Sequence, residues 1–139
     1  TVVVPLMSPI EYENAFKSFI HSVCDLQTHD SLVSVNLLKE YLWDDEKSIN
    51  YQANRGHIVS QDLPNIYKIN NGLYMRDRTS ILKEKYFLGK KPLMFQVSKI
   101  AGVDIDEEED YQIALALLDL YSNVWQNKKY ILGFWWSDH

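Results

Sequence analysis

The first part of the chain alternates between a strand pattern and a helix pattern, and this order constrains the fold more than any other feature. Residues 1–5 are an apolar run that predicts a buried strand. Ser8 at the N-cap, Pro9 at N1 and Glu11 at N3 form a strong helix start with a capping box, and apolar residues at helical spacing continue the helix to about residue 23. Residues 31–35 predict a second strand. A strand–helix–strand order is typical of a parallel sheet, so we expect an α/β fold.

The remainder of the chain adds further elements to this unit. The pattern changes at about residue 40, where a polar stretch predicts a hairpin or a mobile loop. Strand patterns then cover 67–75 and 92–98, and helix patterns cover 79–85 and 107–126. The last helix has a broad apolar face, which predicts packing on the sheet. Residues 127–139 form an aromatic tail that is typical of an edge strand or an interface patch.

Composition argues against several classes of protein. The 139 residues are enough for one domain with a core. A net charge of −5 gives no general electrostatic case for nucleic acid. The single cysteine, Cys24, rules out an internal disulfide, and no apolar run approaches the roughly 18 residues of a membrane span. We therefore expect a cytoplasmic protein without nucleic-acid or membrane partners.

A pair of aspartates, Asp104 and Asp106, is the strongest candidate site. Residues 103–106 have a strand pattern, and residues two apart in a strand point to the same face, so this pair could hold one hard cation against a phosphate. The same residues also fit a helix start, with Asp106 as the N-cap and Glu109 completing a capping box. The acidic run 107–110 would then complement the helix dipole. Both interpretations stay open at this level.

Three further patterns have a structural and a functional interpretation. A basic cluster is either a solvated face or a site for an anionic substrate. Tyr86 and Phe87 are either core residues or an exposed pair that reaches a partner. Asn70, with the following Asn and Gly, predicts a turn or bulge, or amides that read a base or sugar edge. The basic cluster consists of Lys83, Lys85, Lys90 and Lys91 with Arg76 and Arg78.

In their order along the chain, these segments resemble the C-terminal half of the acylneuraminate cytidylyltransferases, also called CMP-sialic acid synthetases. The resemblance extends to about residue 124. Its most specific element is Val-Asp-Ile-Asp at 103–106 before an acidic helix start. The other matching segments are Leu-Met-Ser-Pro at 6–9, Gln-Asp-Leu-Pro at 61–64, Tyr-Lys-Ile-Asn-Asn-Gly-Leu-Tyr at 67–74, and Tyr-Phe-Leu-Gly-Lys-Lys-Pro at 86–92.

The resemblance implies part of a Rossmann-like, nucleotide-diphospho-sugar transferase-like fold: a mostly parallel sheet with helices and a dimerisation arm. It implies one domain over 1–139, with about 40–100 as the dimerisation and acid-sugar region. The implied reaction transfers CMP from CTP to a sialic-type (nonulosonic) acid and releases pyrophosphate. The implied partners are CTP, an acidic sugar and a second copy of the chain.

The resemblance also implies roles for individual residues. Asp104 and Asp106 would bind the Mg²⁺ that accompanies CTP. Lys68, where the family has Arg, would act with them in catalysis, and Gln61 and Asn70 would orient the substrate. The aromatic pair would serve across a dimer interface; it consists of Tyr86 and Phe87.

Three departures from the family pattern favour an alternative. Pro5 and Ser60 replace a family Gln and Arg, and the Gly-rich nucleotide loop is not in this sequence. We therefore expect that loop on another segment or a second chain. The alternative is a non-catalytic dimerisation or interaction module derived from this fold, binding a partner through its aromatic tail.

Overall fold

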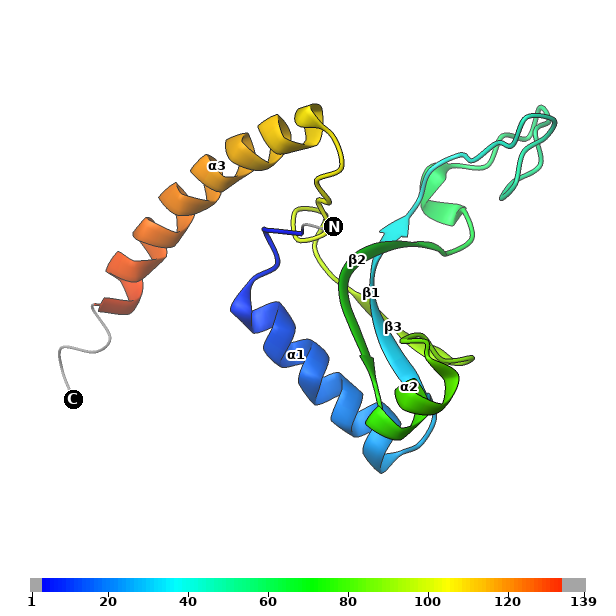
Figure 1. Ribbon diagram of the computed structural model, residues 1–139. Helices are drawn as coiled ribbons and strands as arrows, with labels where there is room; N and C mark the ends of the chain where they lie inside the picture. The colour runs from blue at the N-terminus through cyan, green and yellow to red at the C-terminus, as the bar shows by residue number, and fades with distance from the viewer. Residues whose placement is uncertain (1–3, 134–139) are drawn as a thin grey trace.

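The computed structural model describes residues 4–133, with side chains described as far as residue 120. Its centre is a three-stranded sheet (Figure 1) in the order β2-β1-β3. β1 (Ser31–Leu38) pairs antiparallel with β2 (Ile66–Arg76) and parallel with β3 (Pro92–Gln96). The predicted α/β class is therefore confirmed. The predicted mostly parallel sheet is not, because one of the two strand pairs is antiparallel.

Helices flank this sheet. α1 (Pro9–Phe19) continues as a π-helical segment η1 (Ile20–Asp25) and contacts β1 and β3. A short 3₁₀ turn η2 (Ser60–Asp62) precedes β2, and α2 (Arg78–Glu84) connects β2 to β3. α3 (Glu108–Gly133) is the last element. These bounds confirm the predicted helices at 79–85 and near 8–23.

Two predicted strands are absent from the described residues. Val4 and Pro5 are not in a strand; Pro5 lies in a turn, and proline has no N–H to donate to a sheet. The rest of that prediction lies outside the described residues. Residues 103–106 form a loop because they connect the turn after β3 directly to the start of α3. The two aspartates therefore do not share one face of a strand.

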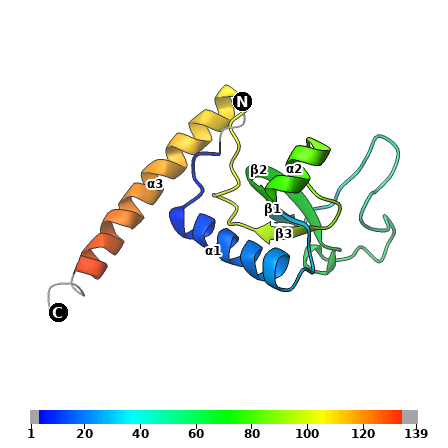
Figure 2. The same cartoon turned by 60° about the horizontal axis from the view of Figure 1, so that its bottom comes forward.

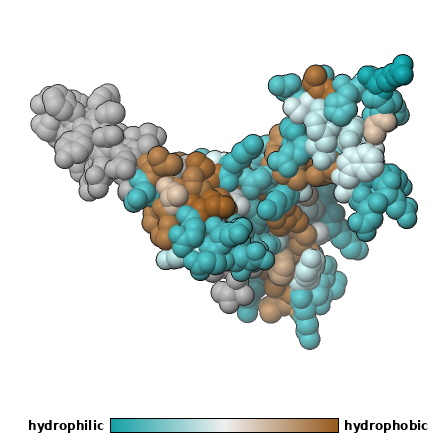
Figure 3. Space-filling view, turned by 90° about the horizontal axis from the view of Figure 1, so that it is seen from above, coloured by the Kyte–Doolittle hydropathy of each residue, from teal (hydrophilic) through white to brown (hydrophobic). Residues whose placement is uncertain are grey.

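α3 differs from its prediction in length and in packing. It continues to Gly133, so residues 130–133 are helical and not part of an edge strand, whereas 134–139 lie outside the described residues. It extends away from the sheet (Figures 1 and 2), and Ile113, Leu118 and Leu120 are exposed by 53%, 53% and 64%. The expected packing of this helix on the sheet is therefore wrong. Figure 3 shows the resulting apolar surface beside the grey end of the chain.

β1 forms the core of the molecule. Leu32, Val33 and Val35 are fully buried, as expected for the central strand of a sheet that is covered by a helix. Ser34 and Asn36 are also buried on this strand, so polar groups lie inside the sheet and need hydrogen-bond partners. Those partners form one wall of the site described below.

A bulge interrupts the pairing of β1 with β2. Val33 pairs with Tyr74 while Val35 pairs with Ile69, so β2 carries three more residues than β1 between these pairs. Asn71, at the centre of the bulge, has a φ of 59°. The predicted bulge is thus confirmed, and its left-handed residue is an asparagine, which tolerates this conformation.

A hairpin of residues 41–59 projects from the sheet between β1 and β2 (Figure 1). An isolated bridge joins Trp43 to Ser48. The ring of Tyr41 packs against Tyr51 and His57, with centroids 5.0 and 4.6 Å away. Of the two predicted alternatives, a hairpin or a mobile loop, the antiparallel bridge favours the hairpin, and aromatic packing at its base stabilises it.

Candidate functional site

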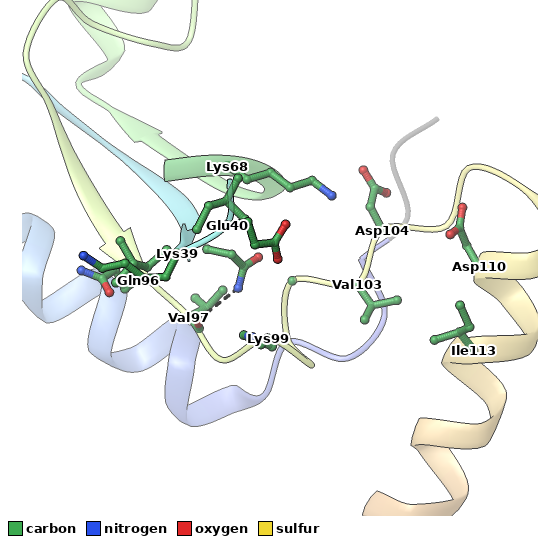
Figure 4. A pocket seen from close by; sticks show the side chains of 14 residues that line it. Lys39, Glu40, Lys68, Gln96, Val97, Lys99, Val103, Asp104, Asp110 and Ile113 are labelled. Carbon is green, nitrogen blue, oxygen red and sulfur yellow. Dashed lines mark hydrogen bonds between the residues drawn. The ribbon is translucent and has the colours of Figure 1, made fainter. Parts of the chain in front are cut away.

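A cleft of about 640 Å³ opens at the ends of β1 and β3 (Figure 4). Both strands run parallel, and the cleft lies where their carboxyl ends meet. Ligands of open α/β sheets commonly bind at this edge. The lining side chains come from the end of β1, the start of β2, the turn after β3 and the start of α3: Asn36, Leu37, Leu38, Lys39, Glu40, Lys68, Gln96, Val97, Lys99, Gly102, Val103, Asp104, Asp110 and Ile113.

Three lysines bring positive charge to the cleft. Lys39, Lys68 and Lys99 line it, and none of them is in an ion pair within the part of the chain whose side chains are described. Lys39 donates to the carbonyl oxygen of Leu63. The Lys68 side chain extends across the cleft toward Asp104 (Figure 4). These ammonium groups can therefore offset the charge of an anionic ligand.

Asp104 lies opposite the end of the Lys68 side chain and has one unpartnered oxygen (Figure 4). Its Oδ2 accepts a hydrogen bond from Asn71 Nδ2 at 3.4 Å. Its Oδ1 is buried and has no hydrogen-bond partner. A buried carboxylate oxygen without a partner is costly, and it indicates a place for a cation or a donor from a ligand.

Asp110 combines a structural role with a place in the cleft. Its Oδ2 accepts hydrogen bonds from the backbone N–H groups of Asp106 and Glu107, at 3.1 and 3.0 Å. The prediction that an acidic side chain caps the start of α3 is thus confirmed, but the capping residue is Asp110 and not Asp106 or Glu109. The helix begins at Glu108, one residue later than expected, so Asp110 and not Glu109 is the third residue of the helix.

A buried polar network forms the wall between the sheet and the cleft. Ser34 Oγ donates to Asn70 Oδ1 at 2.6 Å, and Asn70 Nδ2 donates to Asn36 Oδ1 at 3.0 Å. Asn36 Nδ2 then donates to the carbonyl oxygens of Val97 and Ser98. The network therefore ties β1 and β2 to the turn after β3 that leads to Asp104.

Close packing fixes that turn from its other side. A Cβ atom added to Gly102 would come within 1.8 Å of Asn36 Oδ1, so only glycine fits against the amide. The turn is also held by Glu11, whose Oε1 accepts hydrogen bonds from the N–H and Oγ of Ser98 at 3.3 and 3.2 Å. Glu11 accepts hydrogen bonds from Ser8 as well, within the capping box of α1.

The surroundings of Glu11 favour its charged form. Partial burial alone would raise the pKa of its carboxyl, but hydrogen bonds from Ser8 and Ser98 lower that pKa below its usual 4.5. The charged carboxylate thus joins the start of α1 to the turn after β3. Tyr74, on β2, shows the opposite shift: burial, and then the nearby Tyr86, raises its pKa above the usual 10.0. Its hydroxyl therefore stays protonated and donates to Asn71 Oδ1 at 2.6 Å.

The structure brings together only some of the predicted site residues. Lys68 and Asp104 both line the cleft. Asp106 is exposed and does not line it, and Gln61 is exposed in η2. Asn70 is 1% exposed and its amide is fully engaged within the protein, so it presents no free polar group to a ligand.

The predicted aromatic pair lies near the amino-terminal end of β1, away from the cleft. Tyr86 and Phe87 are exposed by 51% and 46%. Phe87 packs against Tyr74 with ring centroids 4.5 Å apart. Arg76 holds this loop, because its guanidinium donates to the carbonyl oxygen of Tyr86 and to Glu84 Oε2. A role for the pair at a partner's site stays a prediction.

Sequence reasoning missed several residues of the site. Lys39, Glu40 and Lys99 directly follow the parallel strands, and this position after a strand was the signal that could have identified them. Asn71 had been placed in a bulge, but nothing in the sequence indicated that its amide reaches Asp104.

The donor set for a metal ion is small. Among the described side chains, no cluster of three or more His, Cys, Asp or Glu is placed to hold a metal. Three carboxylates line the cleft, namely Glu40, Asp104 and Asp110, and the last two lie just before α3 and in its first turn. Mg²⁺ usually keeps several waters and binds one or two carboxylates together with substrate phosphates. Asp104, through its unpartnered Oδ1, and Asp110 are the two carboxylates that fit such an ion.

Comparison with known protein families and with curated proteins finds no match for this chain. Within residues 4–133, no helix is both long enough and apolar enough to cross a membrane.

Proposed function

We propose that this chain carries the metal- and acid-binding part of a nucleotidyltransferase that transfers CMP from CTP to a sialic-type acid. One observation carries the proposal: three lysines without ion pairs among the described side chains line a cleft at the carboxyl ends of parallel strands, and one of them, Lys68, extends toward Asp104, which has an unpartnered oxygen. A phosphate or sugar carboxylate needs the lysines, and an accompanying Mg²⁺ needs the carboxylates. The sequence resemblance points to the same chemistry.

Two carboxylates and three lysines of the cleft have roles in this proposal. Asp104 and Asp110 hold Mg²⁺, which supplies charge neutralisation for phosphates when bound. Asp110 replaces Asp106 as the second ligand, because Asp106 does not line the cleft. Lys68 positions the negative charge of the sugar or phosphate opposite Asp104, and Lys39 and Lys99 add to the same field.

The nucleotide and the second copy of the chain complete the proposed site. No Gly-rich phosphate loop occurs in these residues, so we propose that a further segment or chain supplies it. Tyr86 and Phe87 are exposed, which suits contact with a partner copy in a homodimer.

Binding measurements test the proposal without requiring turnover. The chain is titrated with N-acetylneuraminate, CMP and CTP in the presence of Mg²⁺ by isothermal calorimetry. We expect binding of at least one of these anions, weakened about tenfold or more in Lys68→Ala, because a contact with a charged group contributes roughly 1.5–3 kcal/mol. Lys68→Arg should retain most of the affinity. Lys47→Ala, an exposed lysine of the hairpin, is the matched control.

The metal assignment has its own variants. Asp104→Asn should remove the Mg²⁺ dependence of anion binding, and Asp106→Asn should leave it intact. Asp25→Asn, at the exposed end of η1, controls for the loss of one carboxylate. Absence of anion binding by the unaltered chain, or equal binding by Lys68→Ala, would refute the proposed function.

The second candidate function is the non-catalytic interaction module. The exposed apolar side chains of α3 favour it, because large apolar patches on a protein surface mark interaction sites. A chain that binds no nucleotide or acid sugar but self-associates would support this candidate over the first.

A further inference from the structure

Asn71 is the residue that connects the bulge of β2 to the cleft. Its Nδ2 donates to Asp104 Oδ2 at 3.4 Å, and its Oδ1 accepts from the Tyr74 hydroxyl at 2.6 Å. The amide is therefore held at its oxygen, and this fixes the direction in which its N–H groups point. One oxygen of Asp104 is thereby occupied, and the unpartnered one is Oδ1.

The backbone around Asn71 is built to place this amide. Asn70, the preceding residue, is locked by Ser34, and its Oδ1 also accepts the N–H of Gly72 at 3.1 Å. A Cβ atom on Gly72 would lie 3.2 Å from Met7 Sδ and from Ser34 Oγ, which leaves little room for another residue. These contacts hold Asn71 in its left-handed conformation.

We propose that Asn71, held by Tyr74, is a positioning residue that orients the Asp104 carboxylate so that Oδ1 is the oxygen presented to a divalent cation. The inference rests on the proposed function, since the cation is the one placed there by Asp104 and Asp110. Partners in the outer shell of a metal ligand commonly change metal affinity about 10- to 100-fold when removed. Asn71 would act by the same principle, through Asp104 rather than by contact with the ion.

Two variants remove the hydrogen bonds with little change to the backbone. Asn71→Gly deletes the amide but accepts a positive φ, so the bulge is kept. Tyr74→Phe removes only the hydroxyl and leaves its ring against Phe87. Asn65→Gly, an exposed asparagine ahead of β2, is the matched control. Mn²⁺ replaces Mg²⁺ as the probe, because free Mn²⁺ can be counted by electron paramagnetic resonance.

We expect Mn²⁺ binding to weaken about tenfold in Asn71→Gly and by less in Tyr74→Phe, with no change in Asn65→Gly. A purely structural role would lower stability and leave the Mn²⁺ affinity of the folded protein unchanged. Equal Mn²⁺ affinity in Asn71→Gly and the unaltered chain would overturn the proposal.

A second measurement separates this proposal from the proposed function. Urea midpoints are compared for Asn71→Gly, Asp104→Asn and the double variant. If the two residues interact, the midpoint shifts are non-additive. Absence of Mn²⁺ binding by the unaltered chain would count against the metal site, and non-additive midpoints would still support the orienting contact. Additive midpoints would overturn that contact whatever the metal result.

Discussion

Asn70 shows how one buried side chain can determine both the fold and the site. It accepts from Ser34 Oγ and from the N–H of Gly72, and it donates to Asn36. Replacement by alanine would leave these buried groups without partners. We expect Asn70→Ala to lower the free energy of unfolding by about 2–3 kcal/mol, measured by urea denaturation.

The matched control is Asn65→Ala, at an exposed position, for which the change should stay below about 0.5 kcal/mol. A similar small loss in Asn70→Ala would mean that the network does not stabilise the sheet. The functional prediction for Asn70 came from a motif, and its burial could not be read from the sequence. Burial depends on which strand lies beside it, and β1 is separated from it by the whole hairpin.

The carboxylate of Glu11 predicts a pH dependence. Its pKa is lowered in the folded state, so the unfolded chain binds the proton more readily. The stability from Glu11 is therefore fully present above the unfolded pKa, near 4.5, and is lost as the pH falls through the lower folded value. Unfolding midpoints of the unaltered chain and Glu11→Gln should differ at neutral pH, and the difference should shrink as the pH falls below 4.5.

Glu109→Gln serves as the control for this measurement, because its exposed side chain makes no hydrogen bond in the described structure. A difference between the unaltered chain and Glu11→Gln that persists unchanged at acid pH would show that the Glu11 charge does not stabilise the link to Ser98. The sequence did predict the capping box of α1, since its partners are three residues apart. The hydrogen bonds from Ser98 to Glu11 join residues far apart in the chain, so no local sequence pattern predicts them.

At the scale of elements, the start of α3 depends on one carboxylate. Asp110 accepts two backbone N–H groups, while its neighbour Glu109 accepts none. We expect Asp110→Ala to weaken the first turn by about 1 kcal/mol, seen as faster hydrogen exchange of the amides of residues 106 and 107. Glu109→Ala removes the same charge from the same turn and should have a smaller effect. Equal exchange in both variants would assign the effect to the helix dipole alone.

The elements that could be predicted are those with local signals. α1 has Ser8 and Pro9, β1 is a continuous buried run, and α2 and β3 follow clear changes of pattern. The prediction of a strand at 103–106 was wrong, because the alternation of apolar and acidic residues there is equally compatible with a loop that leads to a helix. The prediction that α3 packs on the sheet was wrong, because an apolar stripe shows that a helix can bury one face but does not show which surface covers that face.

At the scale of the molecule, two charged surfaces of opposite sign lie far apart. The tip of the hairpin carries Asp44, Asp45 and Glu46 against one lysine, Lys47. The exposed lysine cluster, on α2 and the loop after it, comprises Lys83, Lys85, Lys90 and Lys91. The hairpin and α2 are at different ends of the sheet (Figure 1), so these surfaces cannot pair within one chain. In a two-fold dimer, the acidic hairpin tip of each copy could contact the lysine cluster of the other copy.

This complementarity makes the proposed homodimer testable by charge reversal. Lys83→Glu with Lys85→Glu should weaken self-association about tenfold, as should Asp45→Lys with Glu46→Lys, because like charges then face each other. Combining all four changes should restore association, which a general loss of stability could not do. Added salt should weaken the dimer of the unaltered chain, since exposed charges are screened. Sedimentation equilibrium over a range of concentrations measures each case.

Leu120→Glu is the comparison variant, since it places the same acidic residue on the exposed apolar face of α3. If the hairpin and the lysine cluster form the interface, this variant should associate like the unaltered chain. Dissociation by Leu120→Glu with no effect of the lysine reversals would move the interface to α3, where exposed leucines rather than charges would drive it. The aromatic pair at 86–87 would then lie outside the interface, and the proposal that it completes a partner's acid-sugar site would fail with it.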